Sequence, residues 1–263
     1  MSLQTELTRH NGVAVITLSR PPLNILTWEF RTEIAEKIDQ CASDNQVRVI
    51  VVGSGVDKAF SAGADIKEFA DSMHPGGGAE RCRIEHAAYD AIDFVPKPTI
   101  CAVNGYCLGG GLELAMAFDI RIASEEAIFG QPEIKLGCFP GGGGTERLAL
   151  LVGRAKAKEM MYTGAPIGAT EALRIGLVNR VVPAGSALEE SIKLATMIAQ
   201  YSPLALRSIK ELVDAVHHVP EEMRTALPRV AERVETVFRT EEVRAGANAF
   251  LTRHSRPDDR SPS

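Results

Sequence analysis

The sequence lacks an excess of positive charge. Its 263 residues include 29 lysines and arginines against 34 aspartates and glutamates, which gives a formal net charge of −5 at pH 7. Proteins that bind nucleic acid through its phosphates carry basic patches, so this balance argues against nucleic acid as the main partner. The chain is long enough, and at 45% hydrophobic apolar enough, to bury the core of one enzyme-sized domain.

Cysteine is also scarce. The five residues, an odd number, form no C-x-x-C pair and have no grouped histidine beside them. A disulfide framework and a zinc site are therefore not expected, and we predict reduced thiols and no metal site. The cysteines are Cys41, Cys82, Cys101, Cys107 and Cys138.

A long apolar run and a targeting signal are missing as well. The least polar stretch, residues 100–118, is interrupted by Asn104, Glu113 and several glycines, which makes a membrane span a poor interpretation. The first ten residues contain no charged segment followed by an apolar core, so we expect no secretory or transit signal. These absences together predict a cytoplasmic protein without a membrane partner.

What the sequence does contain is an alternation of strands and helices. Residues 12–20, GVAVITLSR, have the alternating β-branched pattern of a strand, and Pro21-Pro22 ends it. Thr27 is placed to cap a helix over residues 28–43, which has one apolar face. That face comprises Phe30, Ile34, Ile38 and Cys41.

Residues 47–54, VRVIVVGS, form a continuous apolar run typical of a strand that is covered on both faces. Such a strand indicates a parallel sheet, and with helices between the strands it predicts an α/β fold with crossover helices. We expect further strands at 99–103, 120–123 and 177–182.

After Pro183 the pattern is helical, and no further strand is expected. We therefore divide the chain into a core domain over 1–183, a helical region over 184–253 and a flexible tail over 254–263. Amphipathic helices at a chain end commonly pack on another subunit, so an oligomer is expected.

Three consecutive glycines occupy the junction between a predicted strand and a helix in NGYCLGGGLELAM, residues 104–116. Gly109, Gly110 and Gly111 would leave N–H groups unpaired at the helix start, where the helix dipole favours negative charge. The N–H of Gly110 is a candidate for half of an oxyanion hole, although the glycines could equally serve only a tight turn. The segment matches neither a dinucleotide-binding nor a P-loop fingerprint.

A second turn of small residues, SAGADIKE at 61–68, could present the N–H of Ala64 as the other donor. Its Asp65 could instead be no more than a helix cap. The segment that follows, DSMHPGGGAE at 71–80, is expected to be a mobile loop that borders the substrate pocket.

Two glutamates lie close to these turns. Glu113 comes three residues after Gly110, where it could face a bound ligand or simply be stabilised by the helix dipole. Glu133 lies among apolar residues in FGQPEIKLG, and a desolvated carboxylate there would have a perturbed pKa, whereas a loop charge in water would not. Its apolar neighbours in sequence are Phe129, Ile134 and Leu136.

Taken together, three segments resemble the crotonase superfamily, and most of all the enoyl-CoA hydratases. They occur in the family's order, and the resemblance covers residues 10 to 250. It implies a spiral of repeated ββα units followed by a C-terminal helical trimerisation region, with homotrimers or hexamers built as pairs of trimers. The segments are FSAGADIKE, NGYCLGGGLELAMAFDI and FGQPEIKLGCFPGGGGTERL.

The resemblance also implies the chemistry. The thioester carbonyl of an acyl-CoA would lie between the N–H groups of Ala64 and Gly110, which stabilise the enolate oxygen. Glu113 would activate a water for attack at C3, and Glu133 would protonate C2, giving a 3-hydroxyacyl-CoA. No cofactor is implied, since coenzyme A is part of the substrate.

Further residues fall in the segments with which the family binds the CoA thioester, with Lys67 near the adenine or the phosphates. These residues are Ala62, Asp65, Ile66, Lys67 and Gly109. Where the family often has a lysine-rich helix contributed by a neighbouring subunit, this chain reads AFLTRHSRP, and Arg253 could take the place of a lysine.

Two alternatives stay open. A 3,2-enoyl-CoA isomerase of this family can work with a single glutamate, so the presence of both favours a hydratase. An RNA-binding or scaffolding member of the fold would need a basic first helix, whereas residues 27–43 hold four acidic residues against two basic ones.

Overall fold

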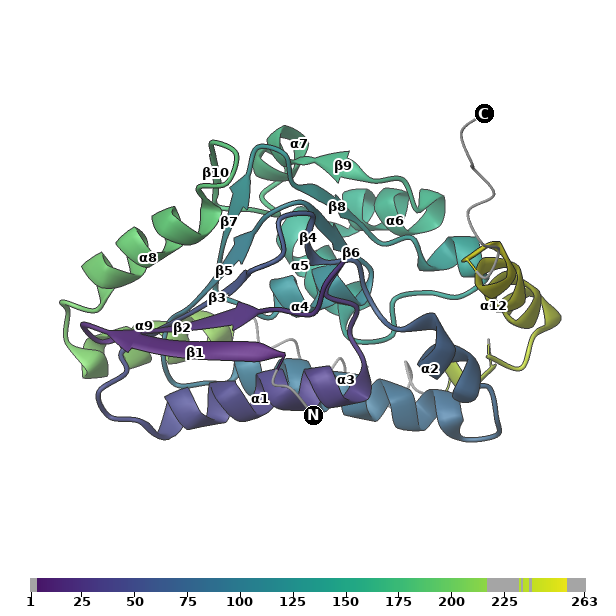
Figure 1. Ribbon diagram of the computed structural model, residues 1–263, viewed down its shortest axis with the longest axis horizontal. Coiled ribbons are helices and arrows are strands. Elements are labelled where there is room, and N and C mark those ends of the chain that lie inside the picture. The colour runs from purple at the N-terminus through teal and green to yellow at the C-terminus, as the bar shows by residue number, and fades with distance from the viewer. Residues whose placement is uncertain (1–3, 217–231, 233, 237, 255–263) are drawn as a thin grey trace, which may run out of the picture.

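Two β-sheets and the helices packed around them make up the fold (Figure 1). The computed structural model describes residues 4–216, 232, 234–236 and 238–254. The strands are β1 Thr5–His10, β2 Val13–Leu18, β3 Val49–Ser54, β4 Ala59–Ser61, β5 Thr99–Val103, β6 Tyr106–Leu108, β7 Ile120–Ser124, β8 Ile128–Gly130, β9 Ile167–Gly168 and β10 Arg180–Val182. The helices are α1 Trp28–Ser43, α2 Ile66–Asp71, α3 Gly77–Asp93, α4 Gly110–Met116, the 3-10 helix η1 Glu133–Leu136, α5 Gly144–Val152, α6 Arg154–Thr163, α7 Ala169–Arg174, α8 Ala187–Ile198, α9 Pro203–Val216 and α12 Glu241–His254.

From β3 to β8, successive strands alternate between the two sheets. The larger sheet has the strand order β1-β2-β3-β5-β7-β10, and the smaller has β4-β6-β8-β9. Thus β3 leads to β4, β5 to β6 and β7 to β8, with helices α2 and α3 after β4 and helix α4 after β6. From β2 to β10 the larger sheet is parallel, as predicted, while β1 pairs antiparallel with β2. The repeated ββα unit that the resemblance implies is therefore present.

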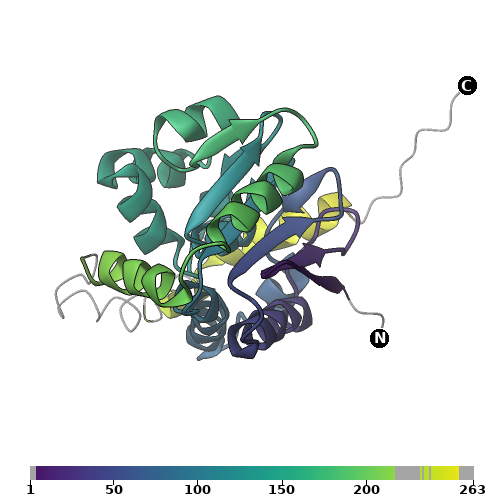
Figure 2. The ribbon, with the colours of Figure 1, turned by 90° about the vertical axis from the view of Figure 1, so that its left-hand side faces the viewer.

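Strand β3 is buried on both faces, as its continuous apolar pattern predicts. Ile50 and Val52 point into the main core, which fills the space between the sheets and α1. Val49 and Val51 point the other way and pack on α8. Figure 2 shows α8 crossing in front of this sheet. The alternation confirms a central strand of a covered parallel sheet.

Helix α1 begins and ends where local signals predict. The Thr27 hydroxyl accepts a hydrogen bond from the N–H of Phe30 at 3.3 Å, which satisfies one of the unpaired donors at the helix start. The four predicted apolar positions are buried. Arg31, which from the sequence was counted only as one of the two basic residues of this helix, is just 3% exposed.

Two further expectations need correction. The strand expected over 177–182 covers only Arg180–Val182, because the N–H groups of Leu177 and Val178 bond back to the carbonyl of Ala172 after α7. The loop expected over 71–80 is wrong in its second half, since residues 77–80 form the first turn of α3. None of residues 71–80 lines the pocket described below.

The described part of the chain after Val182 contains helices α8, α9 and α12, and residues 232, 234–236 and 238 are helical as well. In Figure 1, α8 lies at one end of the molecule and α12 at the other, beside α2. The last residues expected to form a tail, 255–263, lie outside the described residues, as does the side chain of Arg253. None of the helices in the described segments has the length and apolarity that a membrane crossing needs.

Candidate active site

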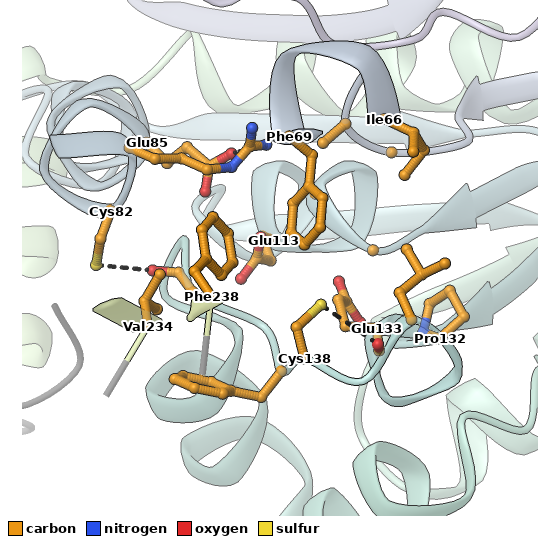
Figure 3. Close-up of a pocket in the computed structure, with 18 of the residues that line it drawn as sticks. Ile66, Phe69, Cys82, Glu85, Glu113, Pro132, Glu133, Cys138, Val234 and Phe238 are labelled. Atoms are coloured by element: carbon orange, nitrogen blue, oxygen red, sulfur yellow. Dashed lines mark hydrogen bonds and ion pairs between the residues drawn. The ribbon is translucent and has the colours of Figure 1, made fainter. Parts of the chain in front are cut away.

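A pocket of about 110 Å³ lies where α2, α3, α4, η1 and the turn before α5 meet. Glu113 and Glu133 point into it from different elements, and two phenylalanines close one side (Figure 3). The lining residues are Ala62, Gly63, Ala64, Ile66, Phe69, Arg81, Cys82, Glu85, Gly109, Gly110, Glu113, Pro132, Glu133, Leu136, Cys138, Phe139, Gly141, Val234 and Phe238.

Two backbone N–H groups flank one small space in this pocket. Ala64 follows β4, and Gly110 is the first residue of α4, at the end of β6. Within residues 4–216, neither N–H donates to a protein acceptor. A Cβ atom placed on Gly110 would lie 3.5 Å from the Ala64 nitrogen, so the two donors are close together. Such a pair can bind an oxygen that gains negative charge.

Gly63 allows the two donor-bearing turns to approach each other. Its φ of +105° is disfavoured for residues with a side chain. A Cβ atom there would lie 2.9 Å from the carbonyl oxygen of Leu108 and 3.5 Å from the Gly110 nitrogen. The turn therefore needs glycine for both its conformation and its close approach.

Glu113 is fixed by the glycine-rich turn before α5. Its carboxylate oxygen Oε1 accepts hydrogen bonds from the N–H groups of Gly142 at 2.8 Å and Gly144 at 2.9 Å. The side chain is 3% exposed, and among the described residues none donates to Oε2. One oxygen thus anchors the carboxylate and the other is left for chemistry.

Burial raises the pKa of Glu113 to about 7, and the negative charge of Glu85 adds to the shift. The two glycine N–H groups and the Arg31 guanidinium oppose it, because each stabilises the ionised form. A carboxyl group with a pKa near neutrality can accept and release a proton under physiological conditions.

Glu133 lies in η1 and faces the same pocket. The buried amide of Gln131 lies against its carboxylate. Only the orientation with the amide NH2 towards Glu133 satisfies both groups, and it then donates to Oε1 at 2.9 Å and to Oε2 at 3.1 Å. The carboxylate is therefore held in place by a side chain two residues earlier.

Burial raises the pKa of Glu133 well above its ordinary value, and the neighbouring charge of Glu113 raises it further. Because the two carboxyl groups are coupled, the pair can carry a single charge and share one proton. The arrangement supplies one base and one acid.

Glycines around the carboxylates leave room for them. Gly109 has a φ of +53°, and a Cβ atom on it would lie 2.9 Å from Oε1 of Glu133. A Cβ atom on Gly142 would lie 2.8 Å from Oε2 of Glu113. Both distances are shorter than van der Waals contact, so a side chain at either position would displace a carboxylate.

The rest of the pocket wall is mostly apolar. The rings of Phe69 and Phe238 meet edge to face with centroids 4.6 Å apart. The Cys82 thiol donates to the carbonyl of Gly141 at 3.1 Å, and the Cys138 thiol donates to the carbonyl of Glu133 at 3.3 Å. Burial raises the pKa of each thiol to about 12, so both stay protonated. All five cysteines are free and buried, as expected.

The structure brings together seven of the nine residues predicted for the site, and two do not line the pocket. The seven are Ala62, Ala64, Ile66, Gly109, Gly110, Glu113 and Glu133. Asp65 caps α2 by accepting from the N–H of Lys67 at 2.8 Å, and the Lys67 side chain is exposed. Ile134 is a correction, because it is 44% exposed and does not shield Glu133.

Sequence reasoning missed buried polar residues in the pocket wall and behind it. Arg31 and Glu85 lie on the buried faces of α1 and α3 and pair at 3.0 Å. A charge on an otherwise apolar helix face was a usable signal, since Arg31 is three residues before Ile34. Nothing in the local sequence marks Gln131. Among the described residues, no three His, Cys, Asp or Glu side chains are grouped as metal ligands.

Comparisons with known proteins show what the chain is similar to. Residues 8–257 match the model of the family described as enoyl-CoA hydratase/isomerase. A probable mitochondrial enoyl-CoA hydratase of Dictyostelium discoideum is 40% identical over 253 residues, 95% of this chain and 89% of that protein. A crotonyl-CoA hydratase of Syntrophomonas wolfei is 38% identical over 250 residues, 93% of this chain and 94% of that protein. The crystal structure of an enoyl-CoA hydratase from Mycobacterium avium subsp. paratuberculosis matches with a TM-score of 0.83 at 30% identity, covering 95% and 96% of the two chains.

Proposed function

Because the chain belongs to the enoyl-CoA hydratase/isomerase family, we propose that it adds water across the C2=C3 double bond of a 2-enoyl-CoA. The product is a 3-hydroxyacyl-CoA, formed in the degradation of fatty acids or related acyl-CoA compounds. The observation that carries the proposal is the pair of carboxylates, buried Glu113 and partly buried Glu133, beside two unpaired backbone N–H groups in one pocket.

The N–H groups of Ala64 and Gly110 receive the thioester carbonyl oxygen. As water attacks C3, the electrons of the double bond move towards this oxygen and form an enolate. Preorganised donors in a site with little water stabilise such a charge, and loss of one typically costs about 3 kcal/mol of barrier. Both donors are backbone groups, so their stabilising effect depends on the backbone geometry and not on side chains. The small residues at 62–64 and 109–111 agree with this requirement.

The two carboxyl groups divide the proton transfers. Ionised Glu113 removes a proton from the attacking water through Oε2, while its Oε1 stays on the glycine turn. Glu133, which holds the shared proton, donates it to C2 as the enolate collapses. The added atoms are one hydroxyl at C3 and one hydrogen at C2, and the proton on Glu113 returns to Glu133 before the next turnover.

Hydration needs no electron transfer, and the two N–H groups supply the electrophilic role, so we propose that the enzyme uses no cofactor beyond the CoA of its substrate. The CoA moiety is proposed to leave the pocket past Ala62 and Ile66, both of which line it. Asp65 orders the start of α2 there, and exposed Lys67 is available to the phosphates or the adenine. Arg253 is proposed as a further contact across subunits.

We further propose a homotrimer, or a hexamer of two trimers, assembled through the region 184–253. The region 1–183 holds both carboxylates and both N–H donors, while Val234 and Phe238 of the helical region complete the pocket wall. In support, α9 has an exposed apolar face. The helix is nevertheless attached to the core, because Lys210 pairs with Asp119 at 2.9 Å. The exposed residues on or beside this helix include Tyr201, Leu204, Ile209, Leu212 and Val213. Free cysteines agree with a reducing compartment, and we propose a cytoplasmic enzyme.

The proposal is tested by mixing purified protein with crotonyl-CoA, without added metal or redox cofactor, and following formation of 3-hydroxybutyryl-CoA. A 3-enoyl-CoA is offered in parallel. Faster conversion of the 3-enoyl substrate would favour the isomerase alternative, and failure to convert either would contradict the proposal. Salt-sensitive RNA retention in a filter-binding assay would favour the non-enzymatic alternative.

A further inference from the structure

Arg31 is a buried cation behind the two candidate oxyanion donors. It projects from α1 and is 3% exposed. A Cβ atom placed on Gly110 would lie 3.6 Å from its Nη2 atom. A buried, paired guanidinium gives little net stability compared with apolar side chains of the same size. Stability therefore does not explain Arg31, and its hydrogen-bond partners indicate its role.

One arm of the guanidinium reaches the turn that carries Ala64. Arg31 Nη1 donates to the carbonyl oxygen of Leu26 at 2.9 Å. Leu26 is in turn paired on both sides of Ala64: its N–H donates to the carbonyl of Gly63 at 2.8 Å, and its carbonyl accepts from the N–H of Asp65 at 3.1 Å. Arg31 thus holds Leu26, and Leu26 holds the turn that carries the Ala64 N–H.

A second arm reaches the residue that carries the other donor. Arg31 Nε donates to the hydroxyl oxygen of Tyr89 at 3.4 Å, and that hydroxyl donates to the carbonyl oxygen of Gly110 at 3.2 Å. Tyr89 is 1% exposed, and burial raises the pKa of its hydroxyl, so the group stays protonated and able to donate.

The third arm fixes the plane of the guanidinium. Arg31 Nη2 donates to Oε1 of Glu85 at 3.0 Å, and Arg81 Nη2 donates to the same oxygen at 2.7 Å. The planar fork of an arginine holds its donors in a rigid arrangement. All three arms therefore start from one fixed group.

We propose that Arg31 and Tyr89 form a brace that sets the position of the Ala64 N–H relative to the Gly110 N–H, and so act as positioning residues for the thioester carbonyl. The inference rests on the proposed function. The two donors follow neighbouring strands, β4 and β6, whose pairing ends at Ser61 and Cys107. Beyond that pairing, no bond between the donors themselves fixes their spacing. An oxyanion needs both donors at about 2.7 to 3.1 Å, and a misplacement of roughly 1 Å can cost about a hundredfold in rate.

The test uses butyryl-CoA labelled with ¹³C at the thioester carbonyl, a saturated analogue that cannot be hydrated. In the wild-type protein both donors polarise the carbonyl, so its infrared stretch lies below that of the free thioester. In Tyr89→Phe we expect the stretch to move back towards the free value. For crotonyl-CoA we expect kcat to fall roughly tenfold while KM stays within about twofold.

Arg31→Lys keeps the charge but loses the fork, and we expect a larger return of the stretch and a fall in kcat of roughly a hundredfold. Tyr162→Phe, on α6 with Tyr162 71% exposed, is the matched control and should change neither quantity. Circular dichroism checks folding. If Arg31→Lys does not fold, Tyr89→Phe decides alone, because it keeps the ring and removes one hydroxyl.

Two outcomes are distinguishable. If the wild-type protein lowers the carbonyl stretch but Tyr89→Phe and Arg31→Lys give the wild-type stretch and kcat, the brace is wrong. If the wild-type protein does not lower the stretch of the bound thioester at all, the proposed oxyanion hole fails, and the brace fails with it.

Discussion

The N–H of Gly144 donates a hydrogen bond of 2.9 Å to the carboxylate of Glu113, a residue 31 positions earlier in the chain. The contact joins the start of α5 to the first turn of α4. It fixes one oxygen of Glu113, stabilises the ionised form, and leaves the other oxygen directed to the pocket. The position and the acidity of the proposed base therefore depend on one glycine turn.

A side chain at Gly144 should displace this base. A Cβ atom there would lie 2.7 Å from Cβ of Pro140, and 2.9 Å from both Glu113 Oε1 and the amide end of Gln131. We expect Gly144→Ala to lower kcat for crotonyl-CoA by at least about tenfold. Steady-state kinetics measure this, with Gly168→Ala as the control because no atom lies within 4 Å of a Cβ there. Equal activity of the two variants would mean that the anchoring contact is dispensable.

The pH dependence should follow the raised pKa values. Glu113 must be ionised to act as base, so kcat/KM should rise with pH through about 7, the pKa that burial and Glu85 produce. Glu133 must keep its proton, whose pKa is raised by burial and by Glu113, so activity should fall again at higher pH. Because the two carboxyl groups interact, the rise and the fall of the profile report pKa values of the pair and not of either residue alone. A profile that is flat between pH 5 and pH 8 would contradict these assignments.

Replacing Glu85 by glutamine should shift the pH profile in a known direction. The variant removes a negative charge that raises the pKa of Glu113. It also leaves the positive charges of Arg31 and Arg81 without the carboxylate that both of them pair with. Each of these two effects favours the ionised form of Glu113. The acid limb of kcat/KM should therefore shift to lower pH. Glu80→Gln, on the exposed side of the same helix, is the control and should leave the limb in place. A shift to higher pH in Glu85→Gln would reverse the electrostatic argument.

Lys67 should contribute to CoA binding and not to chemistry. Its charge is exposed on α2, and an exposed ion pair is worth about 0.2 to 1 kcal/mol. We expect Lys67→Ala to raise KM for crotonyl-CoA about two- to fivefold at unchanged kcat. The KM for crotonyl-pantetheine, which lacks the nucleotide, should not change. An equal rise for both substrates would place the effect elsewhere, and Lys37→Ala on α1 serves as the control.

The exposed apolar face of α9 should be an assembly surface. Leu212 is 69% exposed, and an aspartate there would put an unpaired charge into a subunit contact. We expect Leu212→Asp to lower the mass measured by light scattering after size-exclusion chromatography. Arg207→Glu is the control: it changes a charge on the same helix without replacing one of the exposed apolar residues, and it should keep the wild-type mass. An unchanged assembly in Leu212→Asp would exclude this face from the interface.

Local signals predicted much of the fold. The start of α1 followed from the Thr27 cap, and the double burial of β3 followed from its unbroken apolar run. The second sheet did not follow, because β4, β6 and β8 are three residues each, too short to show periodicity. The spiral came only from the resemblance to a family.

The candidate site divides in the same way. Glu113 and Glu133 were found as motif residues, but each kept an ordinary alternative because burial and partners are tertiary properties. The donors to Glu113 lie 29 and 31 positions away. Arg31 was counted only as a basic residue of the first helix, although its spacing from Ile34 and Ile38 placed it on the apolar face. Gln131 had no such signal, since an amide becomes significant only through the carboxylate that it meets.

Glu113→Gln and Glu133→Gln test the central claim most directly. A glutamine at position 113 can still accept from the Gly142 and Gly144 N–H groups, so the variant removes a base with little change of shape. The measurement is the initial rate of crotonyl-CoA hydration, with unfolding temperature recorded for each protein. We predict loss of at least about a hundredfold in kcat for each variant, with folding retained. Wild-type turnover in both folded variants would contradict the two-carboxylate mechanism.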